Sequence, residues 1–123
     1  MHIKEYFQEI EEIITATLSV LSKEILYNQR TQQIGFIKGT LTFTDGSELY
    51  FKEFVDVETR IIKYRYGYHY QKKDVLIFRY DNHPHKNIPA THKHQAAPED
   101  TVFSSPPTLK EVLNEILLYL PIS

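Results

Sequence analysis

The sequence predicts an α+β fold in which a mostly antiparallel, five-stranded meander sheet carries an N-terminal and a C-terminal helix packed on it. Three observations support this prediction. Apolar residues recur at three- and four-residue steps near both ends of the chain, they alternate with polar residues in the middle, and turn-forming residues separate the alternating runs. A chain of 123 residues is long enough for one hydrophobic core and too short for two, so we expect a single domain over residues 1–123.

Both predicted helices are amphipathic. The first carries one apolar stripe, which consists of Ile3, Tyr6, Phe7, Ile10, Ile13 and Ile14. After Thr15 no single helical face collects the apolar residues, so residues 18–26 suit a strand better. The last helix begins at Thr108 and Glu111, which are spaced as a capping box. Its apolar stripe precedes Pro121 and consists of Leu109, Val112, Leu113, Ile116, Leu117 and Leu120.

The first strands in the middle of the chain are joined by a tight turn. Residues 36–43 alternate between apolar and polar side chains, and an Asp-Gly pair follows them. A two-residue loop would place the apolar residues of the next strand opposite threonines. A three-residue loop over 44–46 pairs Leu41 with Leu49 and keeps both apolar sets on one face. We therefore expect the three-residue loop, with Gly46 in the left-handed conformation.

Two further alternating runs, residues 60–70 and 75–81, combine an aromatic face with a charged one. In the first run the aromatic face contains Ile62, Tyr64, Tyr66, Tyr68 and Tyr70, and the other contains Lys63, Arg65, Gly67 and His69. Because aromatic faces bury well, we interpret the tyrosines as core rather than as a stacking surface for bases. Four polar residues are then expected to project together: Arg65, His69, Arg79 and Asp81.

An extended loop is predicted between Asn82 and Pro107, because five prolines interrupt this stretch. Four of the six histidines of the chain lie in it.

Charge is distributed unevenly along the chain. The formal net charge of −2 by itself argues against a nucleic-acid partner. Residues 60–94, however, contain eight Lys or Arg against two Asp, whereas the rest of the chain contains six against fourteen Asp or Glu. This distribution suggests a basic face for an anionic partner and an acidic face for a protein partner. The alternative is that the fold disperses both signs over a solvated surface.

Several kinds of protein and site are not expected. The sequence has no apolar run of the roughly 18–20 residues that cross a bilayer, and its charged start is unlike a signal peptide. It contains no cysteine, which excludes disulfides, thiolate ligands and a cysteine nucleophile. It also lacks a glycine-rich phosphate loop and a nucleophile elbow. We therefore expect a cytoplasmic protein with no membrane association and no cofactor.

Six short motifs follow one another in a recognisable order. They are Gly-Phe-Ile-Lys-Gly at 35–39, Asp-Gly at 45–46, Lys-Tyr-Arg-Tyr at 63–66, Phe-Arg-Tyr-Asp-Asn at 78–82, a histidine near Pro84 and His-Lys-His at 92–94. In order and spacing, residues 34–116 resemble the TumE family of toxins. The chain departs from the family pattern in its long run of tyrosines and in His83 before the proline. The resemblance implies the toxin half of a two-gene module, which cleaves or binds RNA and is neutralised by an antitoxin protein.

The basic, histidine-rich segment contains the groups that metal-independent RNA cleavage needs. That reaction requires a base for the 2′-hydroxyl, an acid for the leaving 5′-oxygen and cations for the charge that develops on the phosphate. Histidine suits both proton transfers because its ordinary pKa of about 6.5 lies near neutral pH. The candidate catalytic residues are His85 or His92 acting with His94, and Asp81 to orient a histidine. The candidate substrate-binding residues are Arg65, Arg79 and Lys93.

Two other interpretations stay open. The pairs His83/His85 and His92/His94, together with Asp81, offer ligands for zinc, manganese or iron in a metal-dependent hydrolase, although neighbouring lysines disfavour a cation. A non-catalytic module that binds RNA or protein would use the same segment without turnover. The sequence also leaves open whether the chain forms a homo-oligomer.

Overall fold

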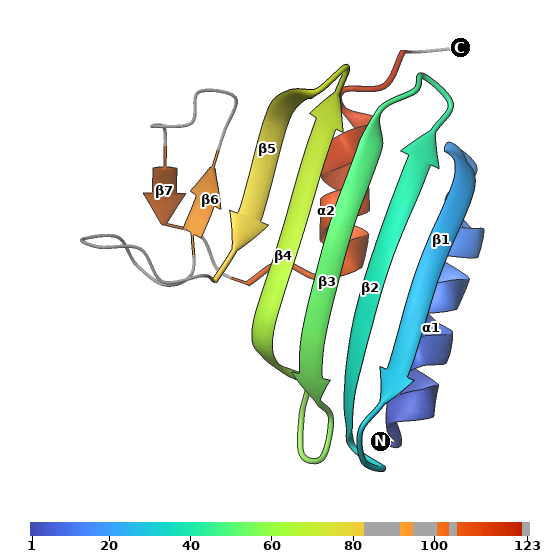
Figure 1. Cartoon of the computed structure of the whole chain (residues 1–123), viewed down its shortest axis with the longest axis vertical. Helices are drawn as coiled ribbons and strands as arrows, with labels where there is room; N and C mark the ends of the chain where they lie inside the picture. Colours follow the sequence, from blue (N-terminus) through green and yellow to red (C-terminus); the bar gives the residue numbers. More distant parts are fainter. Residues whose placement is uncertain (83–91, 95–100, 104–105, 122–123) are drawn as a thin grey trace.

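Figure 1 shows a computed structural model of the chain, in which both helices lie on one face of an antiparallel sheet. The structure describes residues 1–82, 92–94, 101–103 and 106–121, and it describes 92–94 and 101–103 by their backbone alone. The elements are α1 (Ile3–Thr15), β1 (Val20–Gln29), β2 (Ile34–Phe43), β3 (Glu48–Asp56), β4 (Ile62–Lys72), β5 (Val75–Asp81), β6 (His92–His94), β7 (Thr101–Phe103) and α2 (Leu109–Leu117). The strands lie side by side in chain order.

The predicted α+β fold is confirmed, with five long strands in an antiparallel meander and a helix at each end. The prediction of a loop throughout Asn82–Pro107 was wrong at two places, because β6 and β7 extend the sheet beyond β5. Each of these strands has three residues and contains no proline. Proline removes a backbone donor, but a proline-free stretch between prolines can still pair with a sheet edge.

The two helices begin at capping boxes and bury their apolar stripes against the sheet. His2 caps α1, and Thr108 caps α2 by accepting a hydrogen bond from the Glu111 N–H at 3.1 Å. Glu111 in turn accepts a bond from the Thr108 N–H at 3.0 Å, as the spacing predicted. Each helix buries four residues of its stripe: Ile3, Tyr6, Ile10 and Ile14 in α1, and Leu109, Val112, Leu113 and Ile116 in α2. None of the helices in the described part of the chain is long and apolar enough to cross a membrane.

The three-residue loop between β2 and β3 is confirmed. Leu41 pairs with Leu49, and Gly39 with Phe51, so the apolar residues of both strands face the helices. Gly46 has φ +85°, in the left-handed region that glycine adopts without strain. This register fixes which side chains of β2 and β3 lie on the opposite face.

The tyrosines of β4 belong to the core, as interpreted from the sequence. Tyr66, Tyr68 and Tyr70 are at most 2% exposed and join the single hydrophobic cluster between the sheet and the helices. Phe51 stacks on Tyr68 with ring centroids 6.4 Å apart, and Phe43 meets Tyr70 edge-on at 5.9 Å. The other face of the sheet, on which neither helix lies (Figure 1), is therefore formed by the alternate residues of each strand.

The first residues of β4 depart from the predicted alternation. Phe54 pairs with Arg65 and Val55 with Lys63, so Tyr64 is the extra residue of a β-bulge. Consequently Lys63 lies on the buried side, whereas Tyr64 is 50% exposed. The sequence predicted the reverse for both residues, because a bulge shifts the alternation by one without changing residue types.

Candidate functional site

The open face is the face of the sheet on which neither helix lies (Figure 1). The strand register brings polar residues of β4, β5 and β6 into neighbouring rows on this face. His69 pairs with Arg79, and Arg79 pairs with His94. In the adjacent row Asp81 pairs with His92. Directly paired residues of antiparallel strands lie on the same face, so these five positions share the open face.

Arg79 and Asp81 form an ion pair along β5. The Nε of Arg79 lies 3.0 Å from Oδ2 of Asp81, and the two side chains are 36% and 12% exposed. Arg65 is also exposed, and within the described residues no carboxylate lies at ion-pair distance from it. An exposed guanidinium can form two parallel hydrogen bonds with a phosphate. The open face thus contains one cation, Arg79, that is paired with a carboxylate, and one, Arg65, for which the described part of the chain offers none.

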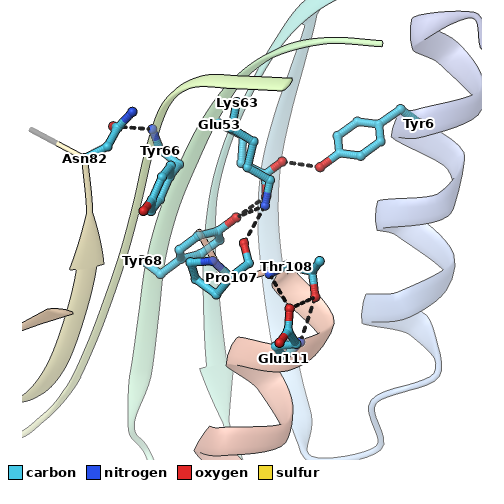
Figure 2. A network of polar contacts seen from close by, with 9 residues as sticks. All are labelled: Tyr6, Glu53, Lys63, Tyr66, Tyr68, Asn82, Pro107, Thr108 and Glu111. Atoms are coloured by element: carbon cyan, nitrogen blue, oxygen red, sulfur yellow. Dashed lines mark hydrogen bonds and ion pairs between the residues drawn. The ribbon is translucent and has the colours of Figure 1, made fainter. Parts of the chain in front are cut away.

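Asn82 fixes the end of β5 to the bulge of β4. Its Oδ1 accepts a hydrogen bond from the Tyr66 N–H at 3.0 Å, which Figure 2 shows. Its Nδ2 donates to the Tyr64 carbonyl oxygen at 2.9 Å. These bonds cross between strands, whereas a simple Asx turn would bond residues close in the chain. The chain is therefore fixed at Asn82, beside Arg65, directly before the part of the sequence that contains four of the histidines.

The structure brings the predicted site residues together in part. Three candidates lie on the open face: Arg65, Arg79 and Asp81. Two more hold register positions on that face: His92 and His94. Lys93 pairs with Tyr80, whose hydroxyl donates to Glu115 of α2 at 2.6 Å. The register position of Lys93 is therefore on the helix side of the sheet, away from the other candidates. The remaining candidate, His85, lies outside the described residues, as does His83.

A buried polar network lies beneath these strands, on the helix side of the sheet (Figure 2). Glu53 has no exposed surface and accepts hydrogen bonds from the hydroxyls of Tyr6 and Tyr68. The Lys63 Nζ lies 3.5 Å from the Glu53 carboxylate, and it donates to the Tyr68 hydroxyl and to the Pro107 carbonyl, each at 2.7 Å. The network ties α1, β3, β4 and the start of α2 together.

The buried surroundings determine the protonation of this network. Burial lowers the pKa of Lys63, while the nearby Glu53 carboxylate opposes that shift. Burial, followed by the Glu53 charge, raises the pKa of Tyr68 and of Tyr6. Both phenols therefore keep their protons near neutral pH and act as donors to the carboxylate. This arrangement suits a structural support for the sheet rather than a proton-transfer site.

No three His, Asp or Glu side chains among the described residues lie together as ligands for a metal ion. The side chains of the two His-x-His pairs are outside that statement, since they are not described. The network around Glu53 is occupied by hydrogen-bond donors and by the Lys63 cation, which are unsuitable neighbours for a metal.

Comparison with known proteins identifies the family. The family model described as Toxin TumE matches residues 6–120, which is most of the chain. The chain belongs to the TumE toxin family. A search of curated proteins and a search of solved structures found no match. TumE membership supports a toxin of a toxin–antitoxin system, and such a toxin has an antitoxin as its partner.

Two further cations occupy the open face of this TumE-family chain. Lys38 pairs with Lys52, and Lys52 pairs with Gly67, so they extend the row of Asp81 across the sheet. Both line a groove of about 920 Å³ that also reaches Arg79. The alternation of β2 already put Lys38 on the polar side. Its position beside the basic segment depended on strand order, which a count of charges along the chain does not reveal.

Proposed function

We propose that the chain is a metal-independent endoribonuclease and that RNA cleavage is its activity as a toxin. The observation that carries this proposal is the register of β4, β5 and β6, in which His69, Arg79 and His94 are consecutive neighbours in one row. The neighbouring pair of Asp81 and His92 adds a carboxylate beside a second histidine. Imidazole and guanidinium groups in adjacent positions can supply the proton transfers and the charge stabilisation of phosphate transesterification.

In the proposed reaction one histidine removes the proton of a ribose 2′-hydroxyl, and the 2′-oxygen attacks the adjacent phosphorus. The second histidine protonates the departing 5′-oxygen as its bond to phosphorus breaks. One P–O bond forms and one is lost, so the products are a 2′,3′-cyclic phosphate and a 5′-hydroxyl, without consumption of water. His94 takes one of these roles, and His92 or His85 takes the other.

The charged residues serve the phosphate in this proposal. Arg79 and Arg65 stabilise the additional negative charge that develops on the phosphate oxygens. Lys93 has no role in this proposal, because its register position lies on the opposite face from His92 and His94. Asp81 orients a histidine, while its ion pair at 3.0 Å keeps Arg79 along the open face. Groups fixed in this way need little rearrangement when charge develops, which lowers the barrier.

The proposal is tested with purified, tag-free protein and a mixed-sequence RNA in excess EDTA. Cleavage is expected in the wild type, with a loss of about 100-fold or more in His94→Ala and in one of the two variants His92→Ala and His85→Ala. His2→Asn is the matched control, because it removes a histidine from the α1 cap and leaves a residue that caps well. Intact RNA at high protein concentration contradicts the proposal.

The same preparation separates the alternatives. A stoichiometric bound metal, together with cleavage that EDTA abolishes, would identify a metal-dependent hydrolase. Salt-sensitive RNA binding without turnover would identify a non-catalytic module.

A further inference from the structure

We infer that the open face of β2, β3 and β4 is a binding site for single-stranded RNA. In this inference Lys38 and Lys52 contact phosphates, and the aromatic side chains on either side of them stack on bases. The inference rests on the proposed function in taking RNA as the ligand. It adds the strand state of the substrate and a site for nucleotides that flank the one being cleaved.

The first support is a pair of neighbouring cations, Lys38 and Lys52, that have no ion-pair partner among the described residues. Lys38 and Lys52 are exposed and directly paired across β2 and β3. In the described part of the chain no carboxylate lies at ion-pair distance from either ammonium. Two adjacent like charges disfavour each other unless an anion lies between or above them. A phosphate backbone crossing the row relieves that repulsion.

The second support is the arrangement of aromatic rings on both sides of this row. On one side Phe36 pairs with Phe54, and the Phe54 ring lies 5.9 Å from the ring of Tyr64. On the other side Tyr50 lies 6.2 Å from His69. Alternate residues of a strand are about 7 Å apart, so each aromatic group lies one such step from the cations. Tyr50 and Tyr64 are exposed, and Phe36, Phe54 and His69 are half-buried. Cations alternating with accessible rings are typical of surfaces that bind unpaired nucleotides.

Hydrogen bonds hold two of these rings at the surface. The Tyr50 hydroxyl donates to Glu48 at 3.0 Å, and the Tyr64 hydroxyl donates to Asp56 at 3.1 Å. Tyr50 is 39% and Tyr64 50% exposed, so a face of each ring is accessible. The two acceptor carboxylates belong to Glu48 and Asp56, the first and last residues of β3. They therefore lie at the ends of this strand and not beside Lys52, which is in its middle.

The third support is the groove itself, which is lined by four cations and one carboxylate among the described residues: Lys38, Lys52, Arg65, Arg79 and Asp81. Gly67 forms part of its floor, and a Cβ there would lie 3.5 Å from Lys52 Cε, an ordinary contact. The position therefore has room for a side chain, and its absence keeps the groove hollow between Lys52 and Asp81. A larger residue at 67 is expected to obstruct it.

These features favour a single strand over a duplex. In a duplex the bases are paired and stacked on one another, so their faces are not accessible to Phe54 or Tyr50. An unpaired strand can place bases on both aromatic groups while its phosphates follow the lysines. The groove also reaches Arg79, so a strand bound along it leads from β2 to the proposed cleavage row.

The test is binding of a 2′-O-methylated single-stranded RNA to the full chain, followed by fluorescence anisotropy. The blocked 2′-oxygen prevents cleavage, so binding is measured separately from chemistry. Phe54→Ala is expected to weaken binding roughly tenfold, the typical loss for one stacked base. Lys38→Ala/Lys52→Ala is expected to reduce the slope of log affinity against log salt by about 1.4, or 0.7 per phosphate contact. Gly67→Leu should weaken binding without removing any charge or ring.

The matched control is Lys4→Ala/Lys110→Ala, which removes two exposed lysines from the helices on the other side of the sheet. It should bind as the wild type does, and circular dichroism checks that each variant is folded. Wild-type affinity in both the double-lysine variant and Gly67→Leu overturns the inference, as does equal affinity for a duplex of the same sequence. If unmodified RNA is still cleaved in that case, the proposed function stands alone. If the single strand binds as described but unmodified RNA stays intact, the binding site stands and the proposed function fails.

Discussion

The carboxylate of Glu53, which has no exposed surface, lies 3.5 Å from the ammonium group of Lys63. Tyr6 and Tyr68 donate hydrogen bonds to the same carboxylate, so each of its oxygens has a hydrogen-bond donor as well as the nearby ammonium group. The ends of this network are α1 and the carbonyl of Pro107, just before α2. The two helices are thereby fixed to the sheet whose opposite face carries the proposed site.

Removing one member of this buried pair is expected to destabilise the fold strongly. Glu53→Gln and Lys63→Met should each lower the free energy of unfolding by about 3–5 kcal/mol, because each leaves a buried charge without its partner. The double variant should lose less than the sum of the two. Glu11→Gln removes the charge of the partly exposed pair with Lys23 and leaves an amide oxygen that can accept from Tyr27. It is the matched control and should change stability by less than about 1 kcal/mol. Urea unfolding measures all four, and additive effects of Glu53 and Lys63 would contradict the coupling.

The raised pKa of Tyr68 predicts a loss of stability at alkaline pH. A phenol whose pKa is higher in the folded state than its ordinary value of 10.0 contributes stability that is complete below that pH. The contribution declines as the pH rises above 10.0 towards the folded pKa, by about 1.4 kcal/mol per pH unit. Lys63 has the opposite sign, but above its ordinary value of 10.5 it is largely neutral in both states.

Urea unfolding between pH 10.5 and 12, with tyrosinate absorbance as a second probe, measures this dependence. We expect the absorbance of Tyr68 to appear together with unfolding, and Tyr68→Phe to reduce the slope of stability against pH. Full titration of every tyrosine in a chain that is still folded would contradict the assignment.

Gly39 is expected to tolerate no side chain, in contrast to Gly67. A Cβ at Gly39 would lie 2.6 Å from the ring of Phe51, which is itself buried in the core. Gly39→Ala should therefore lower the free energy of unfolding by about 1–3 kcal/mol through overpacking. Gly67→Ala lies on the open face of β4, where a Cβ makes only ordinary contacts, and should change the free energy of unfolding far less. Equal effects in a thermal unfolding comparison would contradict the packing described for β2 and β3.

The side chain of Asn82 is expected to hold the end of β5 against the bulge of β4. Asn82→Ala removes the bonds to Tyr66 and Tyr64, at a cost of about 1–2 kcal/mol. The Tyr66 amide should then exchange its hydrogen faster, which NMR-detected hydrogen exchange measures. Asn28→Ala, at an exposed position of β1, is the control. An unchanged exchange rate at Tyr66 would show that Asn82 does not fix this edge.

The parts of the fold that follow from local patterns could be predicted from the sequence. The pairing of Leu41 with Leu49 was predictable because, of a two-residue and a three-residue loop, only the three-residue loop keeps the apolar residues of β2 and β3 on one face. The positions of Lys63 and Tyr64 were not, because a bulge leaves no mark in residue type. The burial of Glu53 was equally hidden, since the two tyrosines and the lysine that satisfy it come from other elements.

The candidate site, too, could be predicted only where it follows from local patterns. Alternation along β4 and β5 was sufficient to place His69 and Arg79 on one face, but their direct pairing depends on a register shift between Tyr70 and Gln71 that the residue types do not reveal. The extension of that row to His94 required β6, a three-residue strand whose pairing is set by the edge of β5 rather than by its own sequence. The position of Lys38 and Lys52 beside this row could be predicted only from the order of strands in the sheet, which is a property of the tertiary structure.

The most direct test of the account compares RNA with its all-2′-deoxy counterpart of the same sequence, each saturated with protein in excess EDTA. The 2′-hydroxyl is the nucleophile in the proposed reaction, so the RNA should be cut to fragments ending in 2′,3′-cyclic phosphate, identified by mass spectrometry, while the deoxy strand is bound and left intact. RNA that stays intact when bound, or a deoxy strand that is cut equally, would contradict cleavage at the neighbouring rows that contain Arg79 and His94 and, beside them, Asp81 and His92.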